Sequence, residues 1–369
     1  METVEIANSR LNNQHISYSF FSEPARLVEY LCCVQAQDFP NAKWGMGVRI
    51  PGINESKIDK AIADFSLVRT WLFRGTLHIV SADDIHWLLG LLSERLILAG
   101  KSRNRQLGLD EAMLKKSQKL IGIKLRDGKA HTRDSIKEYL NNNGIQTPDN
   151  ILAHILQYSA LQSQIVFGPR EGSQFTFVLF ETLKTKNQKK SREEALSDLA
   201  FRYFRSHGPA TIKDFTWWSG LTLTEAKKAI EIAKSKLISE SQGENVYWMA
   251  TNSGKIEKKN QLYLLPAFDS YLLAYRDRSI FLDDLNTSKV ISTNGIFRPI
   301  IVHEGKIVGI WKKIIARNQL ILETSFFKPP KKYVIDELSK KADHFAKYLN
   351  KDLAQVTTND KIVYKAKNV

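Results

Sequence analysis

Residues 208–225 read GPATIKDFTWWSGLTLTE, and this stretch contains the helix boundaries that decide the fold. Its opening Gly-Pro pair ends one helix, because proline cannot continue a helical hydrogen-bond ladder. Residues 211–214 (Thr-Ile-Lys-Asp) then have the spacing of a capping box, which begins a second helix. Residues 222–225 (Thr-Leu-Thr-Glu) repeat that spacing at the start of a third. The stretch therefore predicts three consecutive helices.

The residues that follow predict a hairpin. LISES (237–241) and NVYWM (245–249) are strand-like and flank a polar turn that contains Gly243. Three helices followed by a hairpin are typical of a winged helix, an elaborated helix-turn-helix. The same elements also form small cores in proteins that bind no nucleic acid, and residues 191–255 fit either interpretation.

An earlier segment repeats the order. Thr132 can cap a helix, Pro148 begins another, and QIVFG (164–168) with QFTFVLF (174–180) predicts a second hairpin. A less regular version of the pattern fits residues 1–80. The chain is therefore predicted to be an α+β protein with tandem winged-helix units, three in number.

The remaining segments complete a coarse map of the chain. A helix is expected from Ser22 to Leu31, strands at WGMGVRI (44–50) and Thr76–Val80, and continuous helix over 83–122. After a polar stretch at 252–260, residues 261–327 are β-rich. An amphipathic helix and a polar, frayed end follow. The predicted divisions are 1–125 (first winged-helix unit with a helical extension), 126–190 (second unit), 191–255 (third unit), 256–330 (β-rich domain) and 331–369 (C-terminal helix and tail).

The charge balance indicates a polyanionic partner. Among 369 residues, 54 Lys and Arg oppose 39 Asp and Glu, giving a formal net charge of +15 and a pI near 9.5. Nucleic acid is the first candidate partner and an anionic membrane surface the second. The composition, 43% hydrophobic and 25% charged, is that of a folded protein rather than a disordered or fibrous one.

Several compartments and chemistries are disfavoured. The only cysteines, Cys32 and Cys33, are adjacent, which argues against a structural disulfide and for a reducing compartment. No signal peptide or membrane-spanning run is evident, so a cytoplasmic location is expected. Phosphate-loop, zinc-protease, nucleophile-elbow and cysteine-rich metal motifs are also missing from the sequence. We therefore expect no metal and no cofactor.

One short element can carry chemistry, namely Val34-Gln35-Ala36-Gln37-Asp38. On a regular helix Gln35 and Gln37 would point about 200° apart, so they can converge only where the helix ends or is distorted. A polar helix end at the surface is the alternative reading. Asp38 suits either a general base or a helix cap, and the sequence leaves that choice open.

The chain resembles the AlkZ/YcaQ-like winged-helix DNA glycosylases, which excise alkylated purines and unhook interstrand crosslinks. Five blocks, spread over most of the chain, carry the resemblance. They are QAQ (35–37), RTWLFRGTLH (69–78), TIKDFTWWSGL (211–221), LLPAFDSYLLAYRDR (264–278) and NGIFRP (294–299).

The resemblance implies a fold, a partner and a site. It implies three winged-helix units around a β-rich element, C-shaped about a basic channel for double-stranded DNA. It also implies that Gln35 and Gln37 match the family's catalytic motif. From the resemblance we expect a monofunctional glycosylase with no cofactor and no obligate protein partner. The family also includes members of unknown activity.

Six cations within or near these blocks are candidate contacts to DNA phosphates, and each of them could instead be a surface or structural ion-pair residue. They are Arg69, Arg74, Lys213, Arg276, Arg278 and Arg298. Trp217 and Trp218 could stack on bases, but a packing role is favoured. His78 is expected to form a structural hydrogen bond, with a place near the glutamines as the alternative.

Three functions are compatible with these observations. The first is a DNA-repair glycosylase that hydrolyses the N-glycosidic bond of N7-alkylated purines and possesses activity on crosslinks. The second is a non-enzymatic winged-helix DNA-binding or regulatory protein. The tandem units weigh against it, because such regulators often carry one unit and dimerise on a palindrome. The third is a scaffold that uses winged helices for protein contacts.

Overall fold

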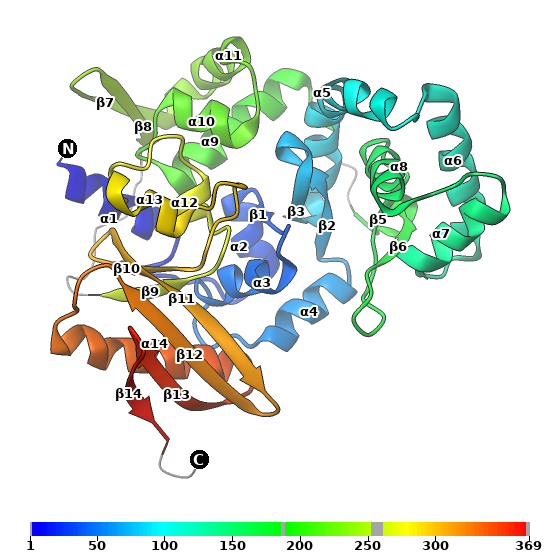
Figure 1. Cartoon of the computed structure of the whole chain (residues 1–369). Coiled ribbons are helices and arrows are strands. Elements are labelled where there is room, and N and C mark those ends of the chain that lie inside the picture. Colours follow the sequence, from blue (N-terminus) through cyan, green and yellow to red (C-terminus); the bar gives the residue numbers. More distant parts are fainter. Residues whose placement is uncertain (1, 186–188, 252–260, 367–369) are drawn as a thin grey trace. The chain divides into compact units, whose positions relative to one another are not determined.

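The computed structural model describes residues 2–185, 189–251 and 261–366 (Figure 1). The chain forms two compact units. Unit 1 contains residues 1–58 and 196–369, and unit 2 contains residues 59–195. Helices and strands are both abundant in each unit, which confirms the predicted α+β class. In the described ranges, no helix combines the length and the apolar character that crossing a membrane requires.

Unit 1 is built on a six-stranded sheet with the order β14-β13-β12-β11-β10-β9. All neighbours are antiparallel except β12 and β13, which are parallel and are joined by helix α14. The strands are β9 (Leu262–Leu265), β10 (Ile300–His303), β11 (Lys306–Ala316), β12 (Gln319–Phe326), β13 (Asp352–Thr358) and β14 (Lys361–Lys365).

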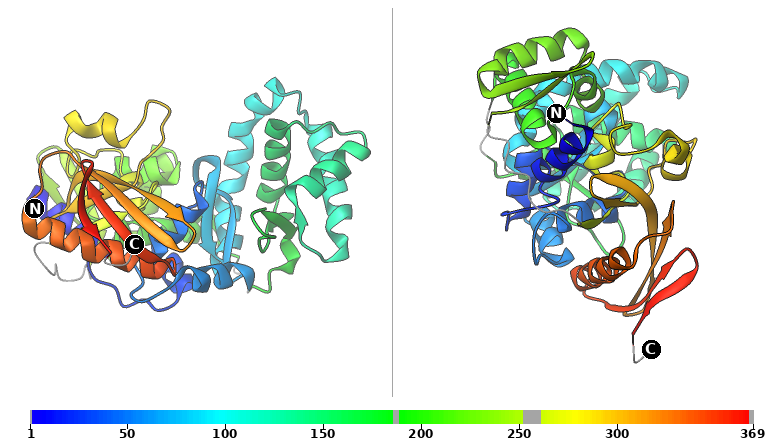
Figure 2. Two further views of the ribbon diagram at one scale, coloured as in Figure 1. Left: turned by 60° about the horizontal axis from the view of Figure 1, so that its bottom comes forward. Right: turned by 90° about the vertical axis from the view of Figure 1, so that its left-hand side faces the viewer.

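Helix α14 (Lys332–Tyr348) lies along one face of this sheet (Figure 2). Its buried residues recur at helical spacing, for example Leu338, Ala342 and Phe345, so one stripe of the helix faces the core. Phe345 packs against Trp44 and Trp311, with ring centroids 4.5 and 5.2 Å away. The sheet and the N-terminal helices therefore share one core.

The other elements of unit 1 come from both ends of the chain. They are α1 (Thr3–Asn13), α2 (Pro24–Leu31), β1 (Val34–Gln35), α3 (Phe39–Gly47), α10 (Ile212–Ser219), α11 (Leu223–Ala233), β7 (Leu237–Gln242), β8 (Asn245–Ala250), α12 (Ser270–Leu273) and α13 (Asp284–Val290). Helices α4 (Glu55–Ala63) and α9 (Arg192–His207) cross the division between the units.

The three-helix and hairpin order predicted for residues 196–250 is confirmed. Both capping boxes form: the Thr211 hydroxyl accepts from the amide of Asp214, and Thr222 does the same for Glu225, each at 3.2 Å. Strands β7 and β8 pair antiparallel, and an isolated bridge joins Ala210 to Trp248. These boundaries depend on local hydrogen bonds, which is why the sequence located them.

Unit 2 contains the helices and the hairpin that were predicted after Thr132 and Pro148. Thr132 caps α7, and the hairpin strands belong to a small sheet with the order β4-β6-β5. Its elements are β2 (Leu67–Leu72), β3 (Thr76–Ser81), α5 (Ile85–Gln106), α6 (Glu111–Lys124), β4 (His131–Thr132), α7 (Arg133–Asn142), α8 (Asp149–Leu161), β5 (Ile165–Phe167) and β6 (Thr176–Leu179). Buried residues of α6, α7, α8 and the hairpin form its core.

Short 3-10 turns occur between several of these elements. They are η1 (Phe73–Gly75), η2 (Ala82–Asp84), η3 (Leu125–Asp127), η4 (Phe180–Thr182) and η5 (Lys234–Lys236).

Three expectations about local structure were wrong. Residues 44–50 were expected to form a strand, but most of them lie in helix α3, and β3 pairs antiparallel with β2 instead of with this segment. All residues from Ala42 to Gly47 are buried, so the helix shows no amphipathic pattern. The expected continuous helix over 83–122 breaks at Gly108, whose positive φ of 73° ends α5, and Asp110 caps α6.

The third correction concerns the C-terminal segment, where a frayed end was expected. Strands β13 and β14 instead extend the sheet of unit 1. The polar stretch at 252–260, the boundary at 255/256 and the last residues, 367–369, lie outside the described residues.

Candidate functional site

Gln35 lies in strand β1 and Gln37 in the bend that follows it, so neither lies at the end of helix α2, which corrects that expectation. Helix α2 ends at Leu31, and Cys32 turns the chain with a positive φ of 71°. The short strand β1 (Val34–Gln35) follows, and the chain bends at Gln37 and Asp38 before helix α3 begins at Phe39. Ala36 is buried, whereas Gln35 is half-buried and Gln37 is exposed. Both glutamines are therefore more accessible than the residue between them.

Asp38 caps helix α3. Its Oδ1 accepts a 3.1 Å hydrogen bond from the backbone amide of Asn41, and its Oδ2 accepts a 2.7 Å bond from the Asn41 side-chain amide. Of the two roles that the sequence left open for Asp38, capping is the one seen in the structure.

A small depression lies beside Gln35. One wall comes from the end of α2, the start of β1 and helix α3, and the other from residues 266–270, which connect β9 to α12. Its volume is about 10 Å³. A cavity of this size holds about one water molecule.

A buried ion pair fixes these two walls. Arg49 donates to both carboxylate oxygens of Asp269, at 2.7 and 2.8 Å, and both residues are almost fully buried. Arg49 also donates to the carbonyls of Gln14 and Gly45, and Asp269 accepts from the amide of Tyr271. Satisfied hydrogen bonds of this kind make a buried ion pair tolerable and geometrically specific. This role of Arg49 was not predicted from the sequence, because residues 44–50 were expected to form a strand.

Phe268 lines the same depression with an unusual backbone. Its φ is +60°, a conformation that bulky residues rarely adopt. The ring lies 5.8 Å from Phe297, between centroids, at an angle of 52°. Backbone strain of this kind tends to occur at functional sites, where the surrounding structure imposes it.

Arg278 is half-buried among aromatic rings next to this cluster. Its guanidinium carbon lies 5.5 Å from the centre of the Phe297 ring and 5.4 Å from that of Trp217, and its Nε donates to the carbonyl of Leu272. Trp217 donates its indole N–H to the carbonyl of Leu273 at 3.0 Å and remains 39% exposed, while Trp218 is buried. These contacts indicate packing roles for both tryptophans.

The other predicted cations fall into two groups. Lys213, Arg276 and Arg298 in unit 1 and Arg74 in unit 2 are exposed, as a phosphate contact requires. Lys213 and Arg276 line one pocket.

Arg69, by contrast, is 4% exposed and lies over the rings of Phe175 and Phe167, at 4.1 and 4.5 Å. Burial, with a smaller contribution from Arg170, lowers its pKa to about 10. Its placement favours a packing role.

His78 is fully enclosed in unit 2. Its Nδ1 lies 3.0 Å from the carbonyl oxygen of Thr76, and burial lowers its pKa to about 3. The structural hydrogen bond expected from the sequence is therefore present. Among the described residues, no group of three or more His, Cys, Asp or Glu side chains is arranged to hold a metal ion.

Comparisons with known proteins agree on one family. A family model described as DNA glycosylase AlkZ-like matches residues 28–348. The interstrand DNA cross-link repair glycosylase of Streptomyces sahachiroi is 23% identical over 354 residues, covering 92% of this chain and 94% of that protein. The solved structure of Streptomyces sahachiroi DNA glycosylase AlkZ superimposes with a TM-score of 0.79 at 22% identity, covering 97% of this chain and 100% of that one.

Proposed function

The chain belongs to the AlkZ-like DNA glycosylase family, and from that premise we propose that it is a monofunctional DNA-repair glycosylase whose catalytic residues are Gln35 and Gln37. Its substrates are N7-alkylated purines in double-stranded DNA. Interstrand crosslinks, which the Streptomyces relative is named for repairing, are a second proposed substrate. The reaction is hydrolysis of the N-glycosidic bond.

The chemistry of this substrate explains why two amides suffice. Cleaving a glycosidic bond builds positive, oxocarbenium-like charge on the sugar. An N7-alkylated purine already carries positive charge, so it leaves without a general acid. The protein has to hold a water molecule against C1′ and direct dipoles at the developing charge. A glutamine carbonyl does both without titrating, and undamaged purines, which are poor leaving groups, stay intact.

One observation carries this assignment: both glutamines are more accessible than the buried Ala36 between them, and Gln35 borders the small depression. The depression has the size of one water molecule, which supports a role in positioning water. The buried pair of Arg49 and Asp269 holds the two walls together, as a preorganised site requires.

The rest of the molecule supplies the proposed DNA contacts. We propose three winged-helix units, in residues 1–125 (with a helical extension), 126–190 and 191–255, followed by a β-rich domain (256–330) and a C-terminal helix and tail (331–369). The proposed ligand is double-stranded DNA. We propose no obligate protein partner and a cytoplasmic location. The exposed cations Arg74, Lys213, Arg276 and Arg298 are the stronger phosphate contacts, and the packed Arg69 and Arg278 are the weaker ones.

The test is base release from duplex DNA that carries N7-methylguanine or, separately, a nitrogen-mustard crosslink. We expect Gln35→Ala and Gln37→Ala each to lower the single-turnover rate by about 10² or more, the effect of removing one transition-state dipole. The control is Gln355→Ala, which removes a half-buried glutamine from strand β13. The wild-type rate should also change little between about pH 6 and pH 8, because neither amide titrates.

The outcomes separate the proposals. Release that persists when Gln35→Ala and Gln37→Ala are combined would support a glycosylase but exclude these residues as its catalytic centre. A steep loss of rate towards pH 6 would contradict the amide mechanism. No release from any alkylated duplex, with DNA binding intact, would favour the non-enzymatic DNA-binding protein.

A further inference from the structure

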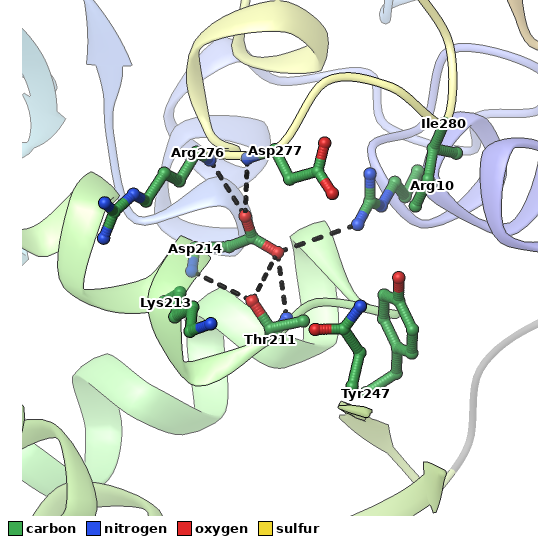
Figure 3. Close-up of a pocket in the computed structure, with 9 residues that line it drawn as sticks. Arg10, Thr211, Lys213, Asp214, Tyr247, Arg276, Asp277 and Ile280 are labelled. Atoms are coloured by element: carbon green, nitrogen blue, oxygen red, sulfur yellow. Dashed lines mark hydrogen bonds and ion pairs between the residues drawn. The ribbon is translucent and has the colours of Figure 1, made fainter. Parts of the chain in front are cut away.

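Helix α1 presents polar side chains to the core of unit 1. Arg10 donates from Nε to the carbonyl of Pro209 at 2.9 Å, and its Nη2 lies 3.8 Å from the carboxylate of Asp214, in the wall of a pocket of about 390 Å³ (Figure 3). Asn13 donates from its side-chain amide to the carbonyl of Gly208 at 2.8 Å. These contacts connect α1 to the first turn of α10 and to the residues that precede it.

Gln14, one turn after Arg10, contacts different groups. It is the C-cap of α1 and its exposed fraction is 0%. Its backbone carbonyl accepts from Nε of Arg49 at 2.9 Å, and its side-chain Oε1 accepts from Nη2 of Arg49 at 3.2 Å. Its Nε2 donates to the hydroxyl of Tyr275 at 2.9 Å. Both ends of the buried amide are therefore hydrogen-bonded.

Gln14 completes the hydrogen bonds of the Arg49 guanidinium. A guanidinium carries five N–H donors in a rigid planar fork. In Arg49, two of these donors go to the carboxylate oxygens of Asp269 and one goes to the carbonyl of Gly45. The other two go to Gln14. Because every donor has an acceptor, the orientation of the guanidinium is fixed.

The orientation of Arg49 matters for the candidate site. Arg49 and Asp269 both line the depression beside Gln35, whereas Gln14 is not among its lining residues. The depression has a volume of about 10 Å³, which is the space of about one water molecule. A small rotation of Arg49 would change the shape of so small a space. Gln14 thus fixes one wall of the depression without contacting what the depression holds.

Tyr275 fixes the direction of the Gln14 amide. Burial raises the pKa of Tyr275, so its hydroxyl keeps its proton, and it donates that proton to the carbonyl of His207 at 2.7 Å. The hydroxyl oxygen is therefore left to accept from Nε2 of Gln14, and Oε1 is directed at Arg49. A side chain that lacks either the donor or the acceptor cannot make both contacts.

We propose that Gln14 is a positioning residue for base release, and that it acts by orienting Arg49 and, through Arg49, the wall of the depression beside Gln35. This inference rests on the proposed function, in which the depression positions water. Gln14 makes no contact with DNA in this proposal. Its loss should therefore lower the rate of the reaction and leave the affinity for DNA unchanged, whereas a merely structural residue would change stability alone.

The test variant is Gln14→Met, which keeps the length of the side chain but removes both polar ends of the amide. The matched control is Asn13→Leu. It removes a buried hydrogen bond from the neighbouring residue, the bond to Gly208, and leaves every bond of Arg49 in place. A second variant, Gln14→Asn, serves if Gln14→Met does not fold. It keeps an amide in the core but withdraws it from Arg49 by one methylene.

Three quantities are measured on the full chain: the thermal midpoint, the dissociation constant for an undamaged duplex, and the single-turnover rate of base release from N7-methylguanine DNA below every midpoint. We expect Gln14→Met and Gln14→Asn to lower the rate by about 10-fold or more, because small misplacements in a preorganised site have effects of up to about 10²-fold. The dissociation constant should not change. Asn13→Leu should lower the midpoint without changing the rate or the dissociation constant.

The outcomes separate this inference from the proposed function. Gln14 variants that release bases as fast as Asn13→Leu would overturn the inference and leave the proposed function intact. Equal losses of rate and of DNA affinity would also overturn it, because they indicate a general structural role. If the wild-type chain releases no base from alkylated DNA, the proposed function is wrong and the role of Gln14 in it is wrong as well.

Discussion

Three buried histidines couple the stability of the folded chain to pH. Burial is the main cause in each case, and it lowers the pKa of His15 to about 4 and those of His78 and His207 to about 3. Their unfolded pKa is about 6.5. Between these values the unfolded chain binds protons that the folded chain does not. Their contribution is therefore fully present above about pH 6.5 and is lost as the pH falls towards 4 and then 3.

The free energy of unfolding should accordingly decrease between about pH 7.5 and about pH 5, by up to about 1.4 kcal/mol per pH unit for each histidine. The urea midpoint, which decreases with it, is the measurement. The variant His207→Gln should show a shallower decrease, whatever its stability at pH 7.5. A midpoint that stays level over this range would contradict the assignment of these histidines as neutral and buried.

Phe268 provides a second residue-scale prediction, because its positive φ is a strained conformation. Both Phe268→Ala and Phe268→Gly lose the ring, but only glycine adopts this backbone freely. We therefore expect the glycine variant to be the more stable by about 1 kcal/mol, the cost of the left-handed region for a residue with a side chain. Urea unfolding measures the difference.

The matched control for Phe268 is its ring partner Phe297, which is not among the residues with positive φ. At that position the order should reverse, because glycine loses more backbone entropy than alanine on folding. A glycine variant of Phe268 that is less stable than its alanine variant would contradict the strain.

At the scale of elements, helix α3 depends on its cap. Asp38→Ala should reduce the free energy of unfolding by about 1 kcal/mol, the usual value of an N-cap, whereas Asp38→Asn should keep it. Because Asn41 engages both carboxylate oxygens, we also expect Asp38→Asn to release bases at nearly the wild-type rate. Urea unfolding and single-turnover base release test the two expectations, and loss of release in Asp38→Asn with unchanged stability would identify Asp38 as a base.

The elements that the sequence located correctly have local determinants. The two capping boxes of α10 and α11 involve residues three apart, so their spacing alone reveals them. Strands β13 and β14 were missed for the opposite reason. β13 pairs with β12, and the whole of helix α14 separates the two strands in the sequence. No local sequence pattern around β13 therefore indicates its partner.

The candidate site also combines residues that a local sequence pattern indicates with residues whose partners are distant in the sequence. The sequence pointed to Gln35 and Gln37 as candidates, but the segment that contains them follows a turn at Cys32. A cysteine gives no local signal for the positive φ found there. Arg49, which follows helix α3, was hidden because the buried run from Ala42 to Gly47 has no amphipathic period. Its partner Asp269 lies 220 residues away, beyond the reach of any local pattern.

For the whole molecule, the net charge of +15 predicts a strong salt dependence of DNA binding. A protein that contacts six or more phosphates loses about 10³-fold or more in affinity between about 50 and 200 mM salt. Fluorescence anisotropy with an undamaged duplex measures this. The double variant Gln35→Ala/Gln37→Ala should keep the same slope, because neither residue neutralises a phosphate. Failure to bind DNA at low salt would instead favour the scaffold.

The discontinuous path of unit 1 has a consequence for biosynthesis. Helices α1 and α3 emerge from the ribosome early, but their partners, the carbonyls of Pro209 and Leu264, are made 199 to 220 residues later. At about 5–20 residues per second this delay is on the order of 10 s or more. The second wall of the depression, residues 266–270, also arrives late. A chain released before residue 266 therefore contains both glutamines without the second wall of the depression, so the proposed site requires synthesis to continue past this segment.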